Sequence, residues 1–163
     1  MNVFKYGDDI NTDLLFPGRY TYTCSKAEEI LPHLLEDLDA DFAKKVKPGD
    51  ILIAGENFGC GSSREQPALG LKAAGIEAII AKSYARIFFR AAINQGLLLI
   101  ECPEAVEAFR EGDELKLDAA AGKVSVAGKS YEFPPLPEEL LKIRDSGGLL
   151  VYAREKLREK RGF

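Results

Sequence analysis

Histidine and tryptophan are almost missing from this chain of 163 residues, which contains one histidine and no tryptophan. A serine or cysteine hydrolase needs a histidine base close to its nucleophile. The single histidine, His33, stands beside Pro32, in a different segment from the serines that follow the central glycines. The sequence therefore disfavours hydrolase chemistry, and we interpret His33 as an ordinary surface or packing residue.

Cysteine is also scarce: Cys24, Cys60 and Cys102 are widely separated and form no C-x-x-C pair. An odd, scattered set disfavours a disulfide framework and gives no support to a zinc or iron–sulfur site built from this chain alone. We therefore expect the chain to bind no metal. Cys24 and Cys102 are most simply small apolar residues. Cys60 lies among glycines ahead of an expected helix, where a thiolate would be stabilised, but we favour the simpler interpretation of a small residue tolerated in a tight turn.

Long apolar runs and a strong charge imbalance are missing as well. No run approaches 18 apolar residues, and the N-terminus turns acidic at Asp8, so we expect neither a membrane span nor a signal peptide. The net charge of −4, with the signs interspersed, disfavours a nucleic-acid binder and binding to anionic membranes. With 46% apolar and 29% charged residues, we expect one cytoplasmic domain over residues 1–163.

Apolar runs alternate with helical patterns in the middle of the chain. Strands are expected at residues 51–54, 78–81 and 97–100, with helices at 67–74 and 84–94 between them. Such a β-α-β-α-β order implies parallel strands joined by right-handed crossovers. The sequence therefore predicts an α/β fold with a mostly parallel sheet flanked by helices.

The two ends of the chain have weaker patterns. Near residues 113–133, alternating apolar and polar residues separated by glycines predict a small antiparallel element. Helical spacing at 26–36 and 39–45 predicts two helices, capped by Ser25 and Asp39, and Pro32 is expected to disturb the first of them. Further elements are expected as a strand at 2–6 and helices at 138–144 and 149–160.

The most informative stretch is the glycine-rich turn from Gly55 to Gln66, which joins an expected strand to an expected helix. Free backbone N–H groups at a helix N-terminus favour an anion, and small residues such as Gly61 let a ligand approach the backbone. Ser62 and Ser63 offer hydroxyls, and Arg64 can hold a carboxylate or phosphate by two parallel hydrogen bonds. This combination predicts a site for a small acidic molecule.

Other interpretations of the same turn can be weighed on spacing. A dinucleotide fingerprint lacks its third glycine here, and a phosphate-binding loop of the Walker type lacks its lysine. Ser62 and Glu65 also match the S-x-x-E capping box, which would serve the helix alone. A cap does not explain the three preceding glycines or the arginine. From the residues alone, both the structural cap and the anion site remain open.

Four blocks of the sequence together point to a known family. They are N-F-G-C-G-S-S-R-E at 57–65, D-I-N-T-D at 9–13, S-Y-A-R-I-F-F at 83–89 and N-Q-G-L at 94–97. These blocks follow one another along the chain as they do in the family. The chain therefore resembles the small subunits of isopropylmalate isomerase and homoaconitase, which correspond to the swivelling domain of aconitase. The resemblance spans about residues 2–155 and implies a swivelling-type β/β/α domain.

The resemblance implies a hydro-lyase that moves a hydroxyl between neighbouring carbons of a di- or tricarboxylic acid. In such enzymes a [4Fe-4S] cluster on the large subunit acts as Lewis acid. It implies that this chain binds no cofactor, is inactive alone, and pairs with a cluster-bearing large subunit as a heterodimer or a dimer of such pairs. A stand-alone carboxylate-binding module is the competing class.

The same resemblance implies roles for individual residues. Ser62 corresponds to the serine that acts as the catalytic base, a role that nearby N–H donors and positive charge would support. Ser63 and Gly61 would contact the substrate, and Arg64 would clamp a substrate carboxylate.

The substrate is expected to depend on the loop that follows Asp13, with the residues Arg19, Tyr20, Thr21, Tyr22 and Thr23. Isopropylmalate isomerases tend to carry an apolar Y-L-V-Y-T loop there, and some homoaconitases a shorter Y-L-R-T. The sequence Y-T-Y-T has the shorter spacing without the arginine, and its hydroxyls suit a carboxylate better than an alkyl group. The loop therefore favours homoaconitate hydratase of lysine biosynthesis, with isopropylmalate isomerase of leucine biosynthesis as the alternative.

Overall fold

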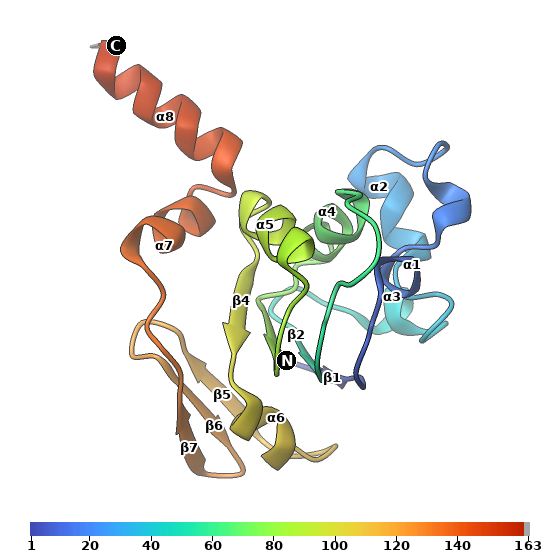
Figure 1. Ribbon diagram of the computed structural model, residues 1–163, viewed down its shortest axis with the longest axis vertical. Coiled ribbons are helices and arrows are strands. Elements are labelled where there is room, and N and C mark those ends of the chain that lie inside the picture. The colour runs from blue at the N-terminus through green and yellow to red at the C-terminus, as the bar shows by residue number, and fades with distance from the viewer. Residues whose placement is uncertain (162–163) are drawn as a thin grey trace.

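Four short parallel strands form the centre of the fold in the computed structural model, which describes residues 1–161 (Figure 1). They are β1 (Val3–Lys5), β2 (Ile51–Ala54), β3 (Ala78–Ala81) and β4 (Leu98–Glu101), hydrogen-bonded in the order β1-β2-β3-β4. The apolar runs of β2 and β3 are buried throughout, as expected for a parallel sheet covered on both faces. The predicted strands are confirmed, with β4 one residue later than expected.

Helices cover one face of this sheet. The crossovers contain α4 (Gln66–Ala73) and α5 (Arg86–Asn94), and the longer β1–β2 connection contains α1 (Thr12–Leu15), α2 (Ala27–Ile30) and α3 (Phe42–Lys45). Because the strands follow one another in order, right-handed crossovers place all these helices on the same side. The strand side chains that pack against them include Leu52, Ile79 and Leu99.

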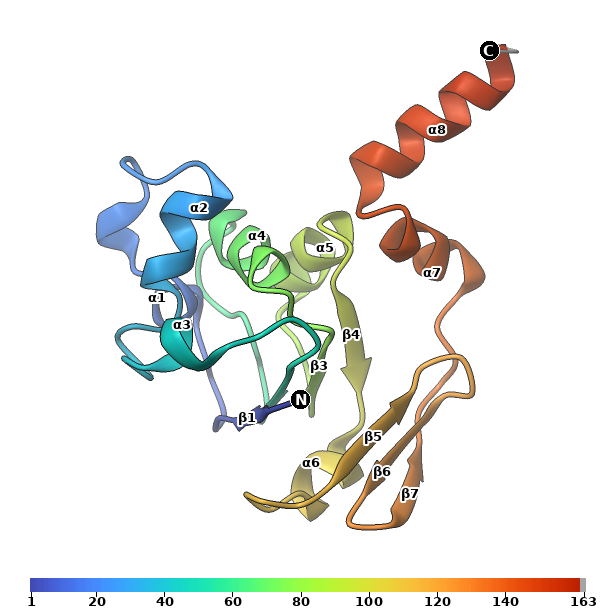
Figure 2. The same ribbon diagram turned by 180° about the vertical axis from the view of Figure 1, so that it is seen from behind.

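The other face of the parallel sheet carries a second, antiparallel sheet (Figure 2). Its strands are β5 (Leu115–Asp118), β6 (Lys123–Val126) and β7 (Lys129–Glu132), and α6 (Pro103–Ala108) packs beside them. Alternate residues of the central strands, such as Ile53, point to this side because successive side chains of a strand face opposite ways. The layers are therefore β/β/α, which confirms the predicted fold class and the antiparallel element.

Two helices end the described part of the chain. They are α7 (Glu138–Asp145) and α8 (Leu149–Arg161), close to their predicted positions. Among the elements within residues 1–161, α7 and α5 make the substantial contacts with α8, which otherwise projects from the body (Figure 1). Within residues 1–161, no helix is both long and apolar enough to cross a membrane.

The predicted helices of the first third are wrong in length. The helix expected at 26–36 stops at Ile30 and continues as a 3₁₀ turn, Leu31–His33, because Pro32 has no N–H to donate. Ser25 does not cap it; instead, the Glu29 carboxylate accepts hydrogen bonds from the backbone N–H groups of Ser25 and Lys26.

The other two boundary errors have similar local causes. The helix expected at 39–45 begins only at Phe42, and its cap is Asp41 instead of Asp39. The carboxylate of Asp39 accepts from the hydroxyl of Tyr6, 3.1 Å away, so it serves the contact with β1. The helix expected from residue 84 begins at Arg86, because Tyr84 pairs with Phe58 as an isolated parallel bridge and the Ala85 N–H donates to the Phe58 carbonyl at 2.9 Å.

Candidate functional site

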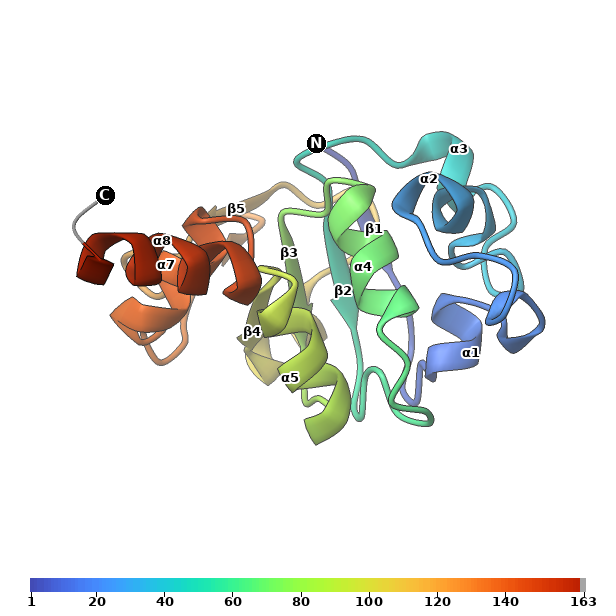
Figure 3. The same ribbon diagram turned by 90° about the horizontal axis from the view of Figure 1, so that it is seen from above.

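Two loops meet beyond the carboxyl ends of the neighbouring strands β1 and β2. Gly59 N–H donates to the Ile10 carbonyl at 2.7 Å, and Thr12 N–H donates to the Cys60 carbonyl at 2.8 Å. Figure 3 shows the connection from β2 to α4 passing beside α1. These backbone bonds bring the D-I-N-T-D block at 9–13 against the glycine turn. The site is thus built where two successive crossovers begin.

Gly59 lets the turn pack closely on α5. Its φ is +78°, and a Cβ there would lie 2.1 Å from Cγ of Phe88. The Phe88 ring is buried and packs edge-on against Phe58, with ring centroids 5.3 Å apart, so it has little room to move. Only glycine fits this position without displacing the core.

Replacing Gly59 by Ala is expected to lower the free energy of unfolding by about 2–4 kcal/mol, from overpacking added to the strain of a positive φ. The matched control is Gly128→Ala, because Gly128 also has a positive φ of +81° but nothing within 4 Å of the Cβ position. Urea denaturation of both variants separates the two contributions. Equal losses in the two variants would show that contact with Phe88 contributes nothing.

Ser62 is held by two neighbours while remaining exposed. Its Oγ lies 2.9 Å from Oγ1 of Thr12 and accepts a hydrogen bond from Nε of Arg64 at 2.8 Å. The Ser62 N–H also donates to Oγ1 of Thr12, at 2.9 Å. Ser63, the next residue, is exposed beside it. The hydroxyl expected to be the base is therefore oriented on one side and open to a ligand on the other.

Arg64 joins the glycine turn to the β1–β2 connection. Besides Ser62, its guanidinium donates to Oγ1 of Thr21 at 2.8 Å and to Oδ1 of Asp13 at 2.5 Å. The arginine side chain is only 15% exposed, whereas that of Asp13 is 71% exposed. A guanidinium has five N–H donors, so one donor on each terminal nitrogen is left over. These two can bind a carboxylate while the arginine stays in place.

The capping-box interpretation of Ser62 and Glu65 is wrong. Helix α4 begins at Gln66 with Glu65 as its N-cap, and no side-chain hydrogen bond is made at that cap. The Ser62 hydroxyl bonds to Thr12, a residue 50 positions earlier in the chain. The serine therefore takes part in the site and does not cap the helix.

The expected substrate loop is only partly at the site. Thr21 contacts Arg64, and its carbonyl accepts from Nε2 of Gln66 at 3.1 Å. Tyr22 is 99% exposed. Thr23 turns back on its own loop, where its hydroxyl donates to the Tyr20 carbonyl at 3.3 Å. The structure thus brings Thr21 together with Ser62 and Arg64, and leaves Tyr22 extending outward.

Arg19 and Tyr20 contact residues 33–37 instead of the glycine turn. The guanidinium of Arg19 forms ion pairs with Glu36 and Asp37, and this pairing holds the pKa of the Asp37 carboxyl below its usual value. The Tyr20 ring stacks on His33 with centroids 3.8 Å apart, and Nδ1 of His33 lies 2.8 Å from the Glu36 carboxylate. His33 is thus a packing residue, as predicted. Arg19 is already occupied by two carboxylates of this chain.

Comparison with known proteins agrees with the geometry. The model of the aconitase C-terminal domain matches residues 10–105. The chain belongs to this family. It is 48% identical over 157 residues to the 3-isopropylmalate dehydratase small subunit of Thermodesulfovibrio yellowstonii, covering 95% of this chain and 93% of that one. It is 51% identical over 159 residues to small subunit 1 of the same enzyme from Archaeoglobus fulgidus, covering 96% and 97%.

A solved member of the family has the same fold. The crystal structure of 3-isopropylmalate dehydratase from Methanocaldococcus jannaschii superposes with a TM-score of 0.89 at 38% identity, covering 99% of this chain and 97% of that chain. The resemblance inferred from the four sequence blocks is therefore confirmed. As a member of this family, the chain is a hydro-lyase small subunit.

The cysteines of this family member do not gather into a metal site. Cys24 and Cys102 are buried, Cys60 is partly exposed, and all three are free thiols. Burial raises the pKa of the Cys102 thiol, as expected for a small apolar residue in the core. Among residues 1–161, no group of three or more His, Cys, Asp or Glu side chains could hold a metal ion. The described residues therefore do not fit an iron–sulfur cluster.

Two residues of the site were not assigned a role from the sequence, Thr12 and Asp13. Both lie in the D-I-N-T-D block at 9–13, which indicated the family but not these contacts. Ser62 bonds to one of them and Arg64 to the other. In the sequence, these two residues are recognisable only as a polar pair at the start of a short apolar helix. The fold is needed to show that they face the glycine turn.

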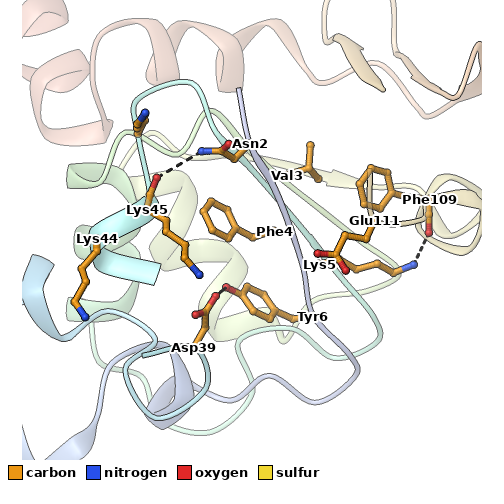
Figure 4. A pocket seen from close by; sticks show the side chains of 11 residues that line it. Asn2, Val3, Phe4, Lys5, Tyr6, Asp39, Lys44, Lys45, Phe109 and Glu111 are labelled. Carbon is orange, nitrogen blue, oxygen red and sulfur yellow. Dashed lines mark hydrogen bonds between the residues drawn. The ribbon is translucent and has the colours of Figure 1, made fainter. Parts of the chain in front are cut away.

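A cavity of about 720 Å³ lies elsewhere, beside the edge strand β1 (Figure 4). Phe4 and Tyr6 line its floor, and Lys44, Lys45 and Lys47 are among its other residues. None of the residues predicted for the site lines it. The candidate site is instead an open surface around Ser62 and Arg64.

Proposed function

We propose that the chain is the small subunit of a 3-isopropylmalate dehydratase, which acts in leucine biosynthesis. The observation that carries the chemistry is the Ser62 oxygen, bonded to Arg64 and exposed to a ligand. The names of relatives that are about half identical to it over nearly their whole length support this substrate. Homoaconitate, which the loop sequence favours, is the second candidate; the relatives support the first.

Ser62 is the proposed base. Its Oγ, as the alkoxide, removes the proton from a carbon next to a substrate carboxylate, the C–H electrons form a carbon–carbon double bond, and hydroxide leaves the neighbouring carbon. In the rehydration, hydroxide adds to the carbon that lost the proton, and Ser62 gives its proton to the carbon that lost the hydroxyl. This step regenerates the alkoxide and completes the isomerisation. A proton next to a carboxylate is weakly acidic, so the base has to be strong and well placed.

Arg64 is the proposed carboxylate clamp. Its two remaining N–H donors are those we assign to a substrate carboxylate, while Asp13 and Thr21 fix the guanidinium. The exposed Ser63 hydroxyl adds a further donor, and the lack of a side chain at Gly61 leaves its backbone accessible. These contacts orient the acidic carbon of the substrate toward Ser62.

We assign the groups that would complete the site, including the ligands of a cluster, to a large subunit. Ser62 and Ser63 are exposed, and residues 1–161 offer no cluster ligands of their own. When present on that subunit, a [4Fe-4S] cluster supplies Lewis acidity toward the substrate hydroxyl and a carboxylate. We propose a heterodimer, or a dimer of such pairs, in which the isolated small subunit has no turnover.

Reconstitution with the large subunit tests the substrate. We expect kcat/KM for 3-isopropylmalate to exceed that for homoisocitrate by at least about tenfold, the usual scale of discrimination by one pocket group. Tyr22 directly follows Thr21, whose hydroxyl contacts Arg64, so we expect Tyr22→Ala to change this ratio. Tyr152→Ala on α8 is the matched control and should leave it unchanged. A preference for homoisocitrate would establish the second candidate.

A further inference from the structure

Thr12 is one of the few buried polar residues, with only 2% of its surface exposed. It begins α1, and its N–H is fixed on the Cys60 carbonyl at 2.8 Å. Asn11 caps the same helix by accepting from the Leu14 N–H at 2.9 Å. A buried hydroxyl needs hydrogen-bond partners, and those of Thr12 are both atoms of Ser62.

The direction of these hydrogen bonds follows from the chemistry of the groups. The Ser62 N–H can only donate, so Oγ1 of Thr12 accepts there. The Thr12 hydroxyl still has its own hydrogen, and within the described residues the acceptor in reach is Oγ of Ser62, 2.9 Å away. The Ser62 oxygen therefore accepts from Thr12 as well as from Nε of Arg64. Its own O–H is left to point to the open side.

Gly61 preserves the contact between Thr12 and Ser62. Its φ is +105°, and a Cβ at this position would lie 2.9 Å from Oγ1 of Thr12. Any side chain there would press on the hydroxyl that bonds to Ser62. The glycine before the serine is therefore required by Thr12.

We propose that Thr12 is a positioning residue that donates a hydrogen bond to the Ser62 oxygen and stabilises its deprotonated form. This inference rests on the proposed role of Ser62 as base. A hydrogen bond donated to an oxyanion is stronger than one donated to a neutral hydroxyl, so this donor favours the deprotonated form of Ser62. Two donors, Thr12 and Arg64, then hold the oxygen from the protein side while its free side faces the substrate.

The test uses the reconstituted two-subunit enzyme with Thr12→Val, which keeps the shape and removes the hydroxyl. We expect kcat to fall about 10- to 100-fold, the usual effect of losing a hydrogen bond to a charged group, with KM within about threefold. Because the anion is less stabilised, the rise of kcat with pH should move to higher pH. Thr12→Ser keeps the hydroxyl and should restore both kcat and the pH profile.

Other outcomes separate this inference from the proposed function. If Ser62→Ala leaves turnover intact, the base assignment is wrong; if Ser62→Ala abolishes it but Thr12→Val changes neither kcat nor the pH profile, only the role of Thr12 is wrong. If Thr12→Val does not assemble, Gly61→Ala provides the second measurement, since it displaces the Thr12 hydroxyl without removing it. An unchanged pH profile in an assembled Gly61→Ala enzyme would overturn the inference.

Discussion

Replacing Ser62 by Ala in the reconstituted enzyme is expected to lower kcat by about 10³-fold or more, the upper range for loss of a positioned general base. Substrate affinity should change little, because proton transfer to Ser62 occurs only in the transition state. Arg64 keeps its bonds to Thr21 and Asp13 in this variant, so the carboxylate clamp remains. The loss should therefore appear in kcat, with a nearly unchanged KM.

Steady-state hydration of the unsaturated intermediate, together with calorimetric binding of the substrate, measures the two quantities separately. Ser130→Ala is the matched control, because Ser130 is exposed and lies on β7, in the separate antiparallel sheet. A stand-alone carboxylate-binding module would behave differently: Ser62→Ala would reduce its affinity modestly, and the wild-type complex would show no turnover to lose.

The central strands and the antiparallel element could be predicted from the sequence because their signals are local. Runs such as Ile51–Ala54 are apolar on both faces, and β5, β6 and β7 alternate between glycine turns. The first third could not be predicted as well. Its short helices depend on tertiary packing, of 27–30 against α4 and of 42–45 against the 3₁₀ turn at 31–33, which no local pattern encodes.

For the candidate site, too, the residues of a contiguous motif could be inferred from the sequence, and their distant partners could not. Ser62 and Arg64 could be proposed from the sequence because the motif around them is contiguous. The partners Thr12 and Asp13 could not, since their contacts join loops about 50 residues apart. The capping-box interpretation was wrong for the same reason. The Ser62 hydroxyl could have capped α4, but it is bonded to Thr12, at the start of α1. Arg19 was a candidate by charge alone, but its nearest carboxylates belong to this chain.

Arg64 is the residue for which the structure makes the second large prediction. Arg64→Lys in the reconstituted enzyme is expected to lower kcat/KM by about 100-fold, corresponding to the loss of one or two charge-assisted hydrogen bonds. A lysine ammonium is a point charge and cannot span Ser62, Thr21 and Asp13 while binding a carboxylate in two places. Arg158→Lys, on the exposed α8, is the matched control and should have no effect.

The two kinetic constants distinguish a clamp from a base. Arg64 contacts both the bound carboxylate and the Ser62 oxygen in the proposed site, so Arg64→Lys should raise KM and lower kcat together, whereas Ser62→Ala should affect kcat alone. Thr21 should also lose its fixed position, because its hydroxyl is held by Arg64 at 2.8 Å. The substrate preference of Arg64→Lys should therefore shift as well. A lysine variant with normal kcat and altered KM alone would show that Arg64 binds substrate but does not support Ser62.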